Sequence, residues 1–324
     1  MELKKIKDTM DKNDLFLVIC AEYLNKHEHL ITRELIEEIT GGNKELDETA
    51  FAHFLSSAFI ENDELADEML REYFIPSIKK LNAEEYRKNP YFQCVKINDK
   101  RYGAWTLSHQ KYAPYEGFVR DDFILPNDYR EVCSIGFFDE EFSFPTIFEN
   151  GVEWMAIKPN EIETMKEPIN KARGNVITFG LGMGYFAYMA SIKAEVKSVT
   201  IVERSAEVID LFKSHILPYF ECKEKIKIIQ ADAFEYVEKQ MRSSDYDYAF
   251  VDLWRDTSDG VDLYIKMKKL EDKHPAVRFE YWIERSILLA IRKKLFYALI
   301  EKKSEDSIEK ILSLDYLKNF VKFI

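Results

Sequence analysis

The sequence has few of the features that mark a secreted, membrane-bound or nucleic-acid-binding protein. Its four cysteines are scattered and form no C-x-x-C pair, so we predict reduced thiols and neither disulfides nor a metal site. No apolar run reaches the roughly 18 residues of a membrane span, and the first residues lack the apolar stretch of a secretory signal. The net charge of −12 disfavours a nucleic-acid partner, because phosphates are neutralised by basic side chains. We therefore expect a cytoplasmic protein without a membrane or nucleic-acid partner.

What the sequence does have is the balance of a soluble globular protein, with 46% hydrophobic and 32% charged residues. Its 324 residues exceed one ordinary core, so we expect more than one domain. Three stretches differ in character: a helical N-terminal domain (1–90), a small β-rich subdomain or lid (91–158), and an α/β domain (159–324) with a helical tail. In the β-rich stretch, strand-forming pieces occur at 92–97, 102–105, 131–135 and 152–157.

From residue 159 onward, strands and helices alternate. Asn160 is predicted to cap a helix that runs to Ala172, and residues 304–324 are predicted to form a last helix. Strands are predicted at 175–179, 198–203, 226–230, 246–252 and 279–283, and helices at 184–194, 205–216, 232–241, 259–270 and 284–301. Alternation of this kind predicts a doubly wound, Rossmann-like parallel sheet.

A glycine-rich loop follows the first of these strands. The strand runs into Gly180-Leu181-Gly182-Met183-Gly184, and a helix is predicted to begin at Tyr185. Glycines are needed where the chain turns tightly and a ligand lies against bare backbone, and the helix start offers unpaired N–H groups. The same letters also fit the dinucleotide pattern G-x-G-x-x-A, so a nicotinamide oxidoreductase stays open as an alternative.

Two acidic residues make an adenosyl ligand more favourable than a nicotinamide one. Glu203 ends the second strand, where a carboxylate can accept both hydroxyls of a ribose. Asp232 follows the third strand, where a carboxylate can accept from the exocyclic amine of adenine. Asp232 is equally suited to cap the helix after it.

Together these features resemble the class I S-adenosylmethionine-dependent methyltransferase family, in its spermidine-synthase-like branch, over residues 175–285. The resemblance implies S-adenosylmethionine as the cofactor. It implies that Gly180, Gly182 and Gly184 face the methionine part, Glu203 the ribose, and Asp232 with Ala233 the adenine, and we add the neighbouring Tyr185 and Arg204 to this predicted site.

The sequence departs from the family pattern in the loop. Thr178 stands where an acid commonly precedes the glycines, and Leu181 and Met183 replace the glycine triplet and acid usual in aminopropyltransferases. The first departure weakens any predicted contact to the amino group of the ligand, and the other two weaken the case for polyamine synthesis. A closing antiparallel hairpin after the fifth helix is also not visible.

The fourth strand ends in Asp252, which would point at the transferred group or at the nucleophile of the substrate. Trp254 could provide an aromatic wall beside a sulfonium or a cationic substrate, so both are predicted catalytic residues. Asp252 could also serve only as a helix cap and Trp254 only as packing. Methyl transfer needs mainly alignment and exclusion of water, because the sulfonium is already an activated leaving group.

The leading hypothesis is an S-adenosylmethionine-dependent methyltransferase acting on a small molecule, in a chain that could form a homodimer. The alternatives are an aminopropyltransferase of the spermidine-synthase type, a non-catalytic module that binds S-adenosylmethionine, and the oxidoreductase mentioned above.

Overall fold

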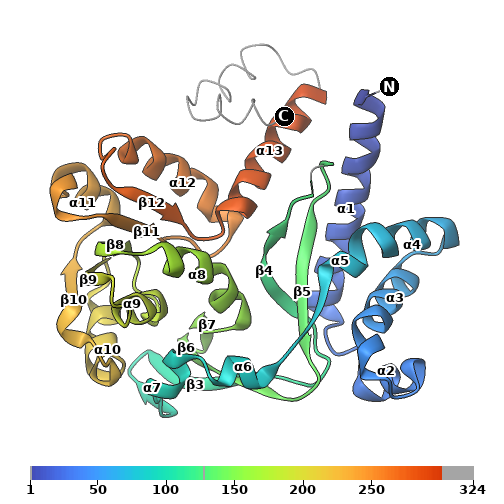
Figure 1. The fold of residues 1–324 in the computed structure, drawn as a ribbon, viewed down its shortest axis with the longest axis horizontal. Coiled ribbons are helices and arrows are strands. Elements are labelled where there is room, and N and C mark those ends of the chain that lie inside the picture. Colours follow the sequence, from blue (N-terminus) through green and yellow to red (C-terminus); the bar gives the residue numbers. More distant parts are fainter. Residues whose placement is uncertain (1, 127, 301–324) are drawn as a thin grey trace.

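The computed structural model describes residues 2–126 and 128–300, which fold around three sheets (Figure 1). The helix predicted at 304–324 lies outside the described residues. Within the described ranges, no helix combines the length and the apolar character needed to cross a membrane.

The largest sheet has five parallel strands and contains all five strands predicted for the α/β part. Their order is β10 (Ile226–Gln230), β9 (Val196–Glu203), β8 (Gly174–Phe179), β11 (Tyr248–Val251) and β12 (Arg278–Tyr281). The chain order reverses between β8 and β11, which pair directly. This arrangement is consistent with the predicted Rossmann-like sheet, in which ligands bind at the reversal, outside the carboxyl ends of the strands.

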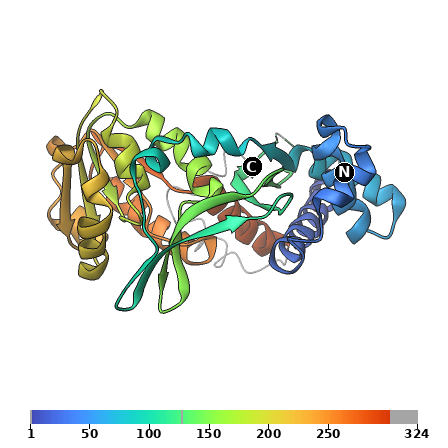
Figure 2. The same cartoon turned by 90° about the horizontal axis from the view of Figure 1, so that it is seen from below.

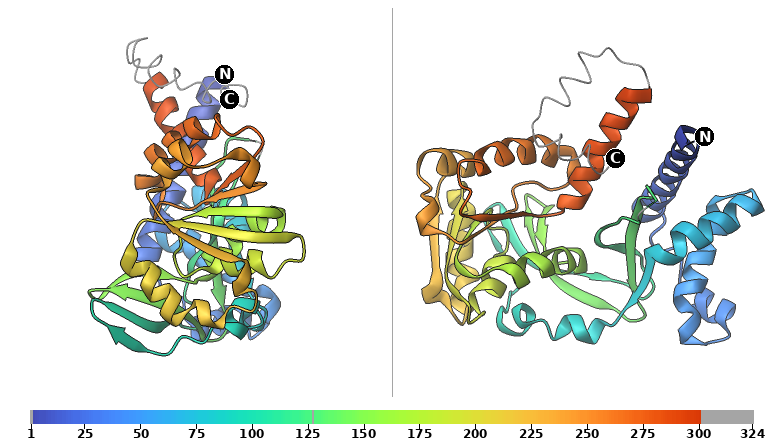
Figure 3. Two further views of the ribbon diagram at one scale, coloured as in Figure 1. Left: turned by 90° about the vertical axis from the view of Figure 1, so that its left-hand side faces the viewer. Right: turned by 45° about the horizontal axis from the view of Figure 1, so that its top comes forward.

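Helices cover both faces of this sheet. Figures 1 and 3 show α8 (Pro159–Lys171) and α9 (Tyr185–Ser191) on one side, with α11 (Ala233–Lys239) and α12 (Thr257–Glu271) on the other. The remaining helices of this part are α10 (Ala206–His215) and α13 (Glu284–Ile300).

The start of α8 corrects one prediction. Asn160 is not the cap, because Lys158 takes that place and Pro159 is the first helical residue. A proline is well suited to this position, since its missing N–H would have no partner within the helix.

A second sheet is antiparallel and comes from the stretch predicted to be β-rich. Its order is β2 (Lys100–Tyr102), β3 (Trp105–Tyr112), β6 (Phe142–Glu149) and β7 (Val152–Ala156). Figure 2 shows β3 and β6 as long, twisted neighbours. The strand predicted at 92–97 is wrong: the chain forms α7 (Pro90–Cys94), because the Asn89 side chain accepts from the Tyr91 N–H at 3.0 Å and caps a helix there.

The N-terminal region is mainly helical, as predicted, but it also contributes a strand. Its helices are α1 (Glu2–Lys26), α2 (Arg33–Thr40), α3 (Asp47–Phe59), α4 (Asp63–Met69), α5 (Ile75–Ser77) and α6 (Ala83–Arg87), with a π-helical turn at Leu70–Phe74. Strand β1 (Ile78–Leu81) pairs in parallel with β5 (Val132–Phe138), which pairs with β4 (Phe118–Ile124). Short 3₁₀ helices lie at Lys44–Leu46, Leu217–Tyr219, Lys223–Lys225 and Ser243–Asp245.

Two hydrophobic cores hold these layers. One core joins the parallel sheet and its helices to the antiparallel sheet, so that Trp105 and Leu107 of β3 are buried together with Phe179 of β8. The other core lies between the N-terminal helices and β5, where the rings of Phe51 and Phe137 stack at 4.6 Å. The antiparallel sheet is therefore packed onto the α/β part of the molecule.

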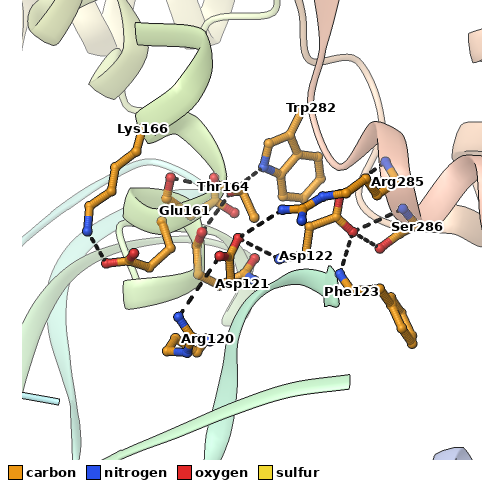
Figure 4. A network of polar contacts seen from close by, with 12 residues as sticks. Arg120, Asp121, Asp122, Phe123, Glu161, Thr164, Lys166, Trp282, Arg285 and Ser286 are labelled. Atoms are coloured by element: carbon orange, nitrogen blue, oxygen red, sulfur yellow. Dashed lines mark hydrogen bonds and ion pairs between the residues drawn. The ribbon is translucent and has the colours of Figure 1, made fainter. Parts of the chain in front are cut away.

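Helix α13 connects the α/β part to the sheet that contains β4, and the carboxylate of Asp122 in β4 binds the first turn of this helix (Figure 4). The Asp122 carboxylate accepts from the backbone N–H groups of Arg285 and Ser286 at 3.1 and 3.0 Å, and also from the Ser286 hydroxyl. Further along the helix, Arg292 pairs with Glu131 at 2.7 Å. Asp122 thus acts as a helix cap supplied from a distant strand.

We predict that Asp122→Ala lowers the free energy of unfolding by about 1–2 kcal/mol, because it removes the cap and leaves two backbone donors unsatisfied. Chemical denaturation of the full chain measures this. Asp121→Ala is the matched control, since that carboxylate accepts from the neighbouring Asp122 N–H at 2.7 Å and lies 3.8–4.0 Å from two arginines, but accepts from no backbone N–H of α13 within the described residues. Equal effects of the two substitutions would contradict the capping role.

Candidate functional site

The glycine loop lies against the end of the neighbouring strand. Gly180 has a φ of +99°, and a Cβ atom there would lie 2.0 Å from the backbone carbonyl oxygen of Asp252. Gly184, with a φ of +74°, precedes α9, and a Cβ there would lie 2.4 Å from the Phe212 ring. Both positions therefore exclude any side chain, on conformational and on steric grounds.

Glu203 supports this loop from the end of β9. One of its carboxylate oxygens accepts from the Leu181 N–H at 3.3 Å, and the other accepts from the Ser205 N–H at 2.8 Å. The side chain is half-buried. Glu203 thus links the turn after β8 to the turn after β9. Its predicted role, accepting hydrogen bonds from the hydroxyls of a ribose, stays a prediction.

Asp232 caps helix α11. One of its carboxylate oxygens accepts from the Glu235 N–H at 3.0 Å, which confirms the prediction that this residue can cap the helix after it. The residue is exposed, and the neighbouring Ala233 is buried. Because a carboxylate has two oxygens, capping leaves the second one able to accept from a ligand.

A cavity of about 1090 Å³ opens at the carboxyl ends of the parallel strands. Its walls include residues that follow each of the five strands, from the glycine loop to Trp282. The opposite wall comes from the first 161 residues, including Glu28, Glu116 and Trp154. This volume lies slightly above the usual range for small-molecule sites, about 300–1,000 Å³.

The cavity brings together eight of the ten predicted site residues: Gly180, Gly182, Glu203, Arg204, Asp232, Ala233, Asp252 and Trp254. Gly184 and Tyr185 do not line it. The Tyr185 ring is buried on the other side, where its hydroxyl accepts from the Asn89 side chain at 2.8 Å. Burial raises the pKa of Tyr185 to about 12, so its hydroxyl stays protonated at neutral pH.

Asp252 follows β11 and is one of the residues that line the cavity. Burial raises its pKa to about 7. It does not cap the next helix, because Asp256 does so in a capping box with Asp259. Arg255 forms no ion pair with Asp256 among the described contacts: its backbone N–H donates to Asp259.

Trp254 lies deeper in the same wall. Its side chain is 5% exposed and its ring lies parallel to that of Tyr281, with centroids 6.3 Å apart. A Cβ atom at Gly260 would lie 3.0 Å from the Cγ atom of the indole ring, so the ring packs directly against this glycine. The indole N–H has no hydrogen-bond partner within the described residues. Packing accounts for most of the surface of Trp254, although the residue also borders the cavity.

The sequence analysis missed Glu161, in the first turn of α8. This residue lines the cavity, and the pKa of its carboxyl is raised well above the ordinary value by burial and then by the charge of Asp252. An acid in a first helical turn is common because it suits the helix dipole. Its sequence position therefore carried no signal of a site.

The cavity wall is strongly acidic. Ten carboxyl side chains line it, against three basic ones (Lys158, Arg204 and Arg255). The acids are Glu28, Glu116, Glu149, Glu153, Glu161, Glu203, Glu207, Asp232, Asp252 and Asp259. Such a wall favours cationic ligands and disfavours anionic ones. In the described ranges, no group of three or more His, Cys, Asp or Glu side chains is arranged to hold a metal ion.

No protein-family model matches the chain, and no curated protein does. Among solved structures, the chain is similar to spermidine synthase from Thermotoga maritima, at 16% identity and a TM-score of 0.32. The similarity covers 46% of this chain and 55% of that one, so the chain spans about half the length of that enzyme. The comparison decides neither methyl nor aminopropyl transfer, and the function is argued from the site.

We predict that Asp252→Asn stabilises the fold at pH 8 and that this gain disappears near pH 4. Because the folded state raises the pKa of Asp252 to about 7, the penalty on its charge is complete above pH 7. It vanishes below about 4, the ordinary pKa of an unfolded aspartate. Thermal midpoints of both proteins across this range provide the measurement.

The matched control is Asp262→Asn, since Asp262 is an exposed acid on α12 outside the cavity. Its effect on the midpoint is expected to be small and independent of pH. A loss of stability for Asp252→Asn at pH 8 would show that the charged carboxylate is well solvated or paired.

Proposed function

We propose that this protein is a transferase that binds S-adenosylmethionine in the cavity and passes its methyl group to a small-molecule acceptor. One observation carries the proposal: the glycine loop, Glu203 and Asp232 line the same cavity as the free carboxyl of Asp252. The glycine loop offers bare backbone to a nucleoside, and Glu203 and Asp232 offer hydrogen-bond acceptors. Asp252 offers an acceptor for the proton of a nucleophile.

Methyl transfer requires little covalent chemistry from the protein. The nucleophile of the acceptor attacks the methyl carbon, the carbon–sulfur bond breaks, and its electrons stay on the sulfur as a neutral thioether. The residues around the cavity would align the two ligands and exclude water. A carboxyl whose pKa is about 7 can exchange a proton near neutral pH, which suits Asp252 to this step.

The acidity of the wall favours a second candidate, aminopropyl transfer from decarboxylated S-adenosylmethionine. That donor carries no carboxylate, so it would meet the ten acids without repulsion. Leu181 and Met183 in the loop still argue against it, because the family members of this activity carry glycine and an acid there. The two reactions leave different products, which makes them separable.

We expect S-adenosylmethionine and S-adenosylhomocysteine to raise the thermal midpoint of the full chain, and NAD to leave it unchanged, because a ligand of the native state stabilises it. Formation of S-adenosylhomocysteine with an acceptor would identify methyl transfer. Formation of methylthioadenosine from the decarboxylated donor would identify aminopropyl transfer. Stabilisation by NAD alone would overturn the proposal, and binding without turnover of either donor would favour a binding module.

Three substitutions test the nucleotide end. Asp232→Ala is expected to weaken adenosyl binding about tenfold and more than Asp252→Ala does, because it removes a charged acceptor. Asp232→Asn keeps an oxygen for the helix cap and so separates capping from ligand contact. The control is Asp210→Ala, an exposed acid on α10 outside the cavity. The reverse order for Asp232 and Asp252 would contradict their roles.

A further inference from the structure

Helix α7, which replaces a predicted strand, contacts the glycine loop through Tyr91. This side chain is 0% exposed, and its hydroxyl donates to the Met183 carbonyl oxygen at 2.7 Å. Its ring meets the rings of Tyr185 and Tyr188 in α9 edge-on, with centroids 5.5 and 5.6 Å apart. Neither Tyr91 nor Met183 lines the cavity. Tyr91 therefore reaches the loop from outside the cavity, and packing against α9 fixes its ring.

The Met183 carbonyl has no other donor within the described residues. It precedes α9, and the helical hydrogen bonds begin with the next carbonyl, that of Gly184, which accepts from the Tyr188 N–H at 2.8 Å. Because a buried carbonyl without a donor is costly, the Tyr91 hydroxyl satisfies a group that the helix leaves unpaired. Burial also raises the pKa of Tyr91 above its ordinary value, which keeps the hydroxyl protonated as a donor.

The same peptide unit closes the turn of the loop. Its carbonyl belongs to Met183 and its N–H to Gly184, and that N–H donates to the Leu181 carbonyl oxygen at 2.8 Å. A bond between the first and fourth residues of this kind closes a β-turn. Tyr91 thus holds one side of the peptide unit, and Leu181 holds the other. Without the hydroxyl the peptide unit is free to rotate toward another donor, which would break the bond that closes the turn.

This turn contains the part of the loop that borders the cavity. Gly182 is one of its two central residues, has a φ of +49° and lines the cavity. Its N–H donates to no residue in 2–126 or 128–300. A glycine-rich turn before a helix binds ligands through free backbone N–H groups of this kind. Their direction depends on the shape of the turn, and hence on the bond at Met183.

We propose that Tyr91 is a positioning residue of the nucleotide site, whose hydroxyl holds the glycine loop in the conformation that binds the adenosyl ligand. The inference rests on the proposed function, and it gives α7 a role in binding without contact to the ligand. Because the loop is held before the ligand arrives, binding costs less conformational freedom. When only a fraction of the molecules have the binding conformation, the apparent affinity falls by that fraction.

The test is binding of S-adenosylhomocysteine to the full chain, measured by calorimetry well below the thermal midpoint of each variant. Tyr91→Phe removes only the hydroxyl and is expected to raise the Kd about tenfold, as a fall of the competent fraction to about a tenth would. The stoichiometry is expected to stay that of the wild type. It reports the folded fraction, whereas the Kd reports the loop, so a general loss of folded protein is distinguished from a displaced loop.

Tyr248→Phe is the matched control. Tyr248 is also buried, and its hydroxyl donates to a backbone carbonyl, that of Pro168, at 2.9 Å. It is the first residue of β11, at the opposite end of the strand from the cavity. Its Kd is expected to stay within about twofold of the wild type. An unchanged Kd in Tyr91→Phe, an equal rise in both variants, or a lower stoichiometry without a change in Kd would overturn the inference and leave the proposed function standing.

A second measurement needs no ligand. Hydrogen exchange of the Gly184 amide is expected to be about tenfold faster in Tyr91→Phe and unchanged in Tyr248→Phe, because this amide exchanges when the turn opens. If no adenosyl compound binds the wild type, the proposed function is overturned, and the exchange rates still decide whether Tyr91 holds the loop. Faster exchange in Tyr91→Phe alone would support that contact, and equal rates in all three proteins would overturn it.

Discussion

The contact between the glycine loop and the end of β11 is the constraint on which the candidate site depends. The carbonyl oxygen of Asp252 occupies the place that a side chain at Gly180 would take, and the Asp252 N–H donates to Phe179 at 2.9 Å. Since β8 and β11 are neighbours where the strand order reverses, the chains after them diverge. This divergence leaves room for a ligand between the loop and the Asp252 side chain.

The other wall of the cavity comes from parts of the chain with no place in the parallel sheet. The antiparallel sheet is packed against the α/β core, which brings Trp105 and Glu153 to the site. Helix α13 is capped by Asp122 from β4 and pairs through Lys293 with Asp14 of α1, so it links the α/β part to the N-terminal helices. The stretch predicted to be a small β-rich subdomain or lid contributes to the cavity wall, and its antiparallel sheet is packed on the α/β core.

The acids around the cavity fall into two groups: some accept hydrogen bonds from the backbone, and others accept none from the described residues. Glu203 and Asp259 satisfy backbone donors in the turns that shape the cavity, and such bonds hold a loop in one conformation. Glu161 and Asp252 satisfy none among the described residues, and their raised pKa values reflect the cost of withdrawing a charge from water. That cost falls when a cationic ligand enters, so the same burial that destabilises the free protein favours the complex.

The sequence by itself determined the five parallel strands, the glycine loop and the positions of Glu203 and Asp232, because a strand and the turn after it are contiguous and their signals are local. It could not show β1, which forms only by pairing with β5 far along the chain, and it missed α7, where the cap by Asn89 overrides a β-prone composition. Only the tertiary structure decided that Tyr185 lies outside the cavity and that Glu161 lines the same cavity as Asp252. Both depend on how α7, α8 and α9 pack, and packing is a property of surfaces brought together by the fold, which no short stretch of sequence encodes.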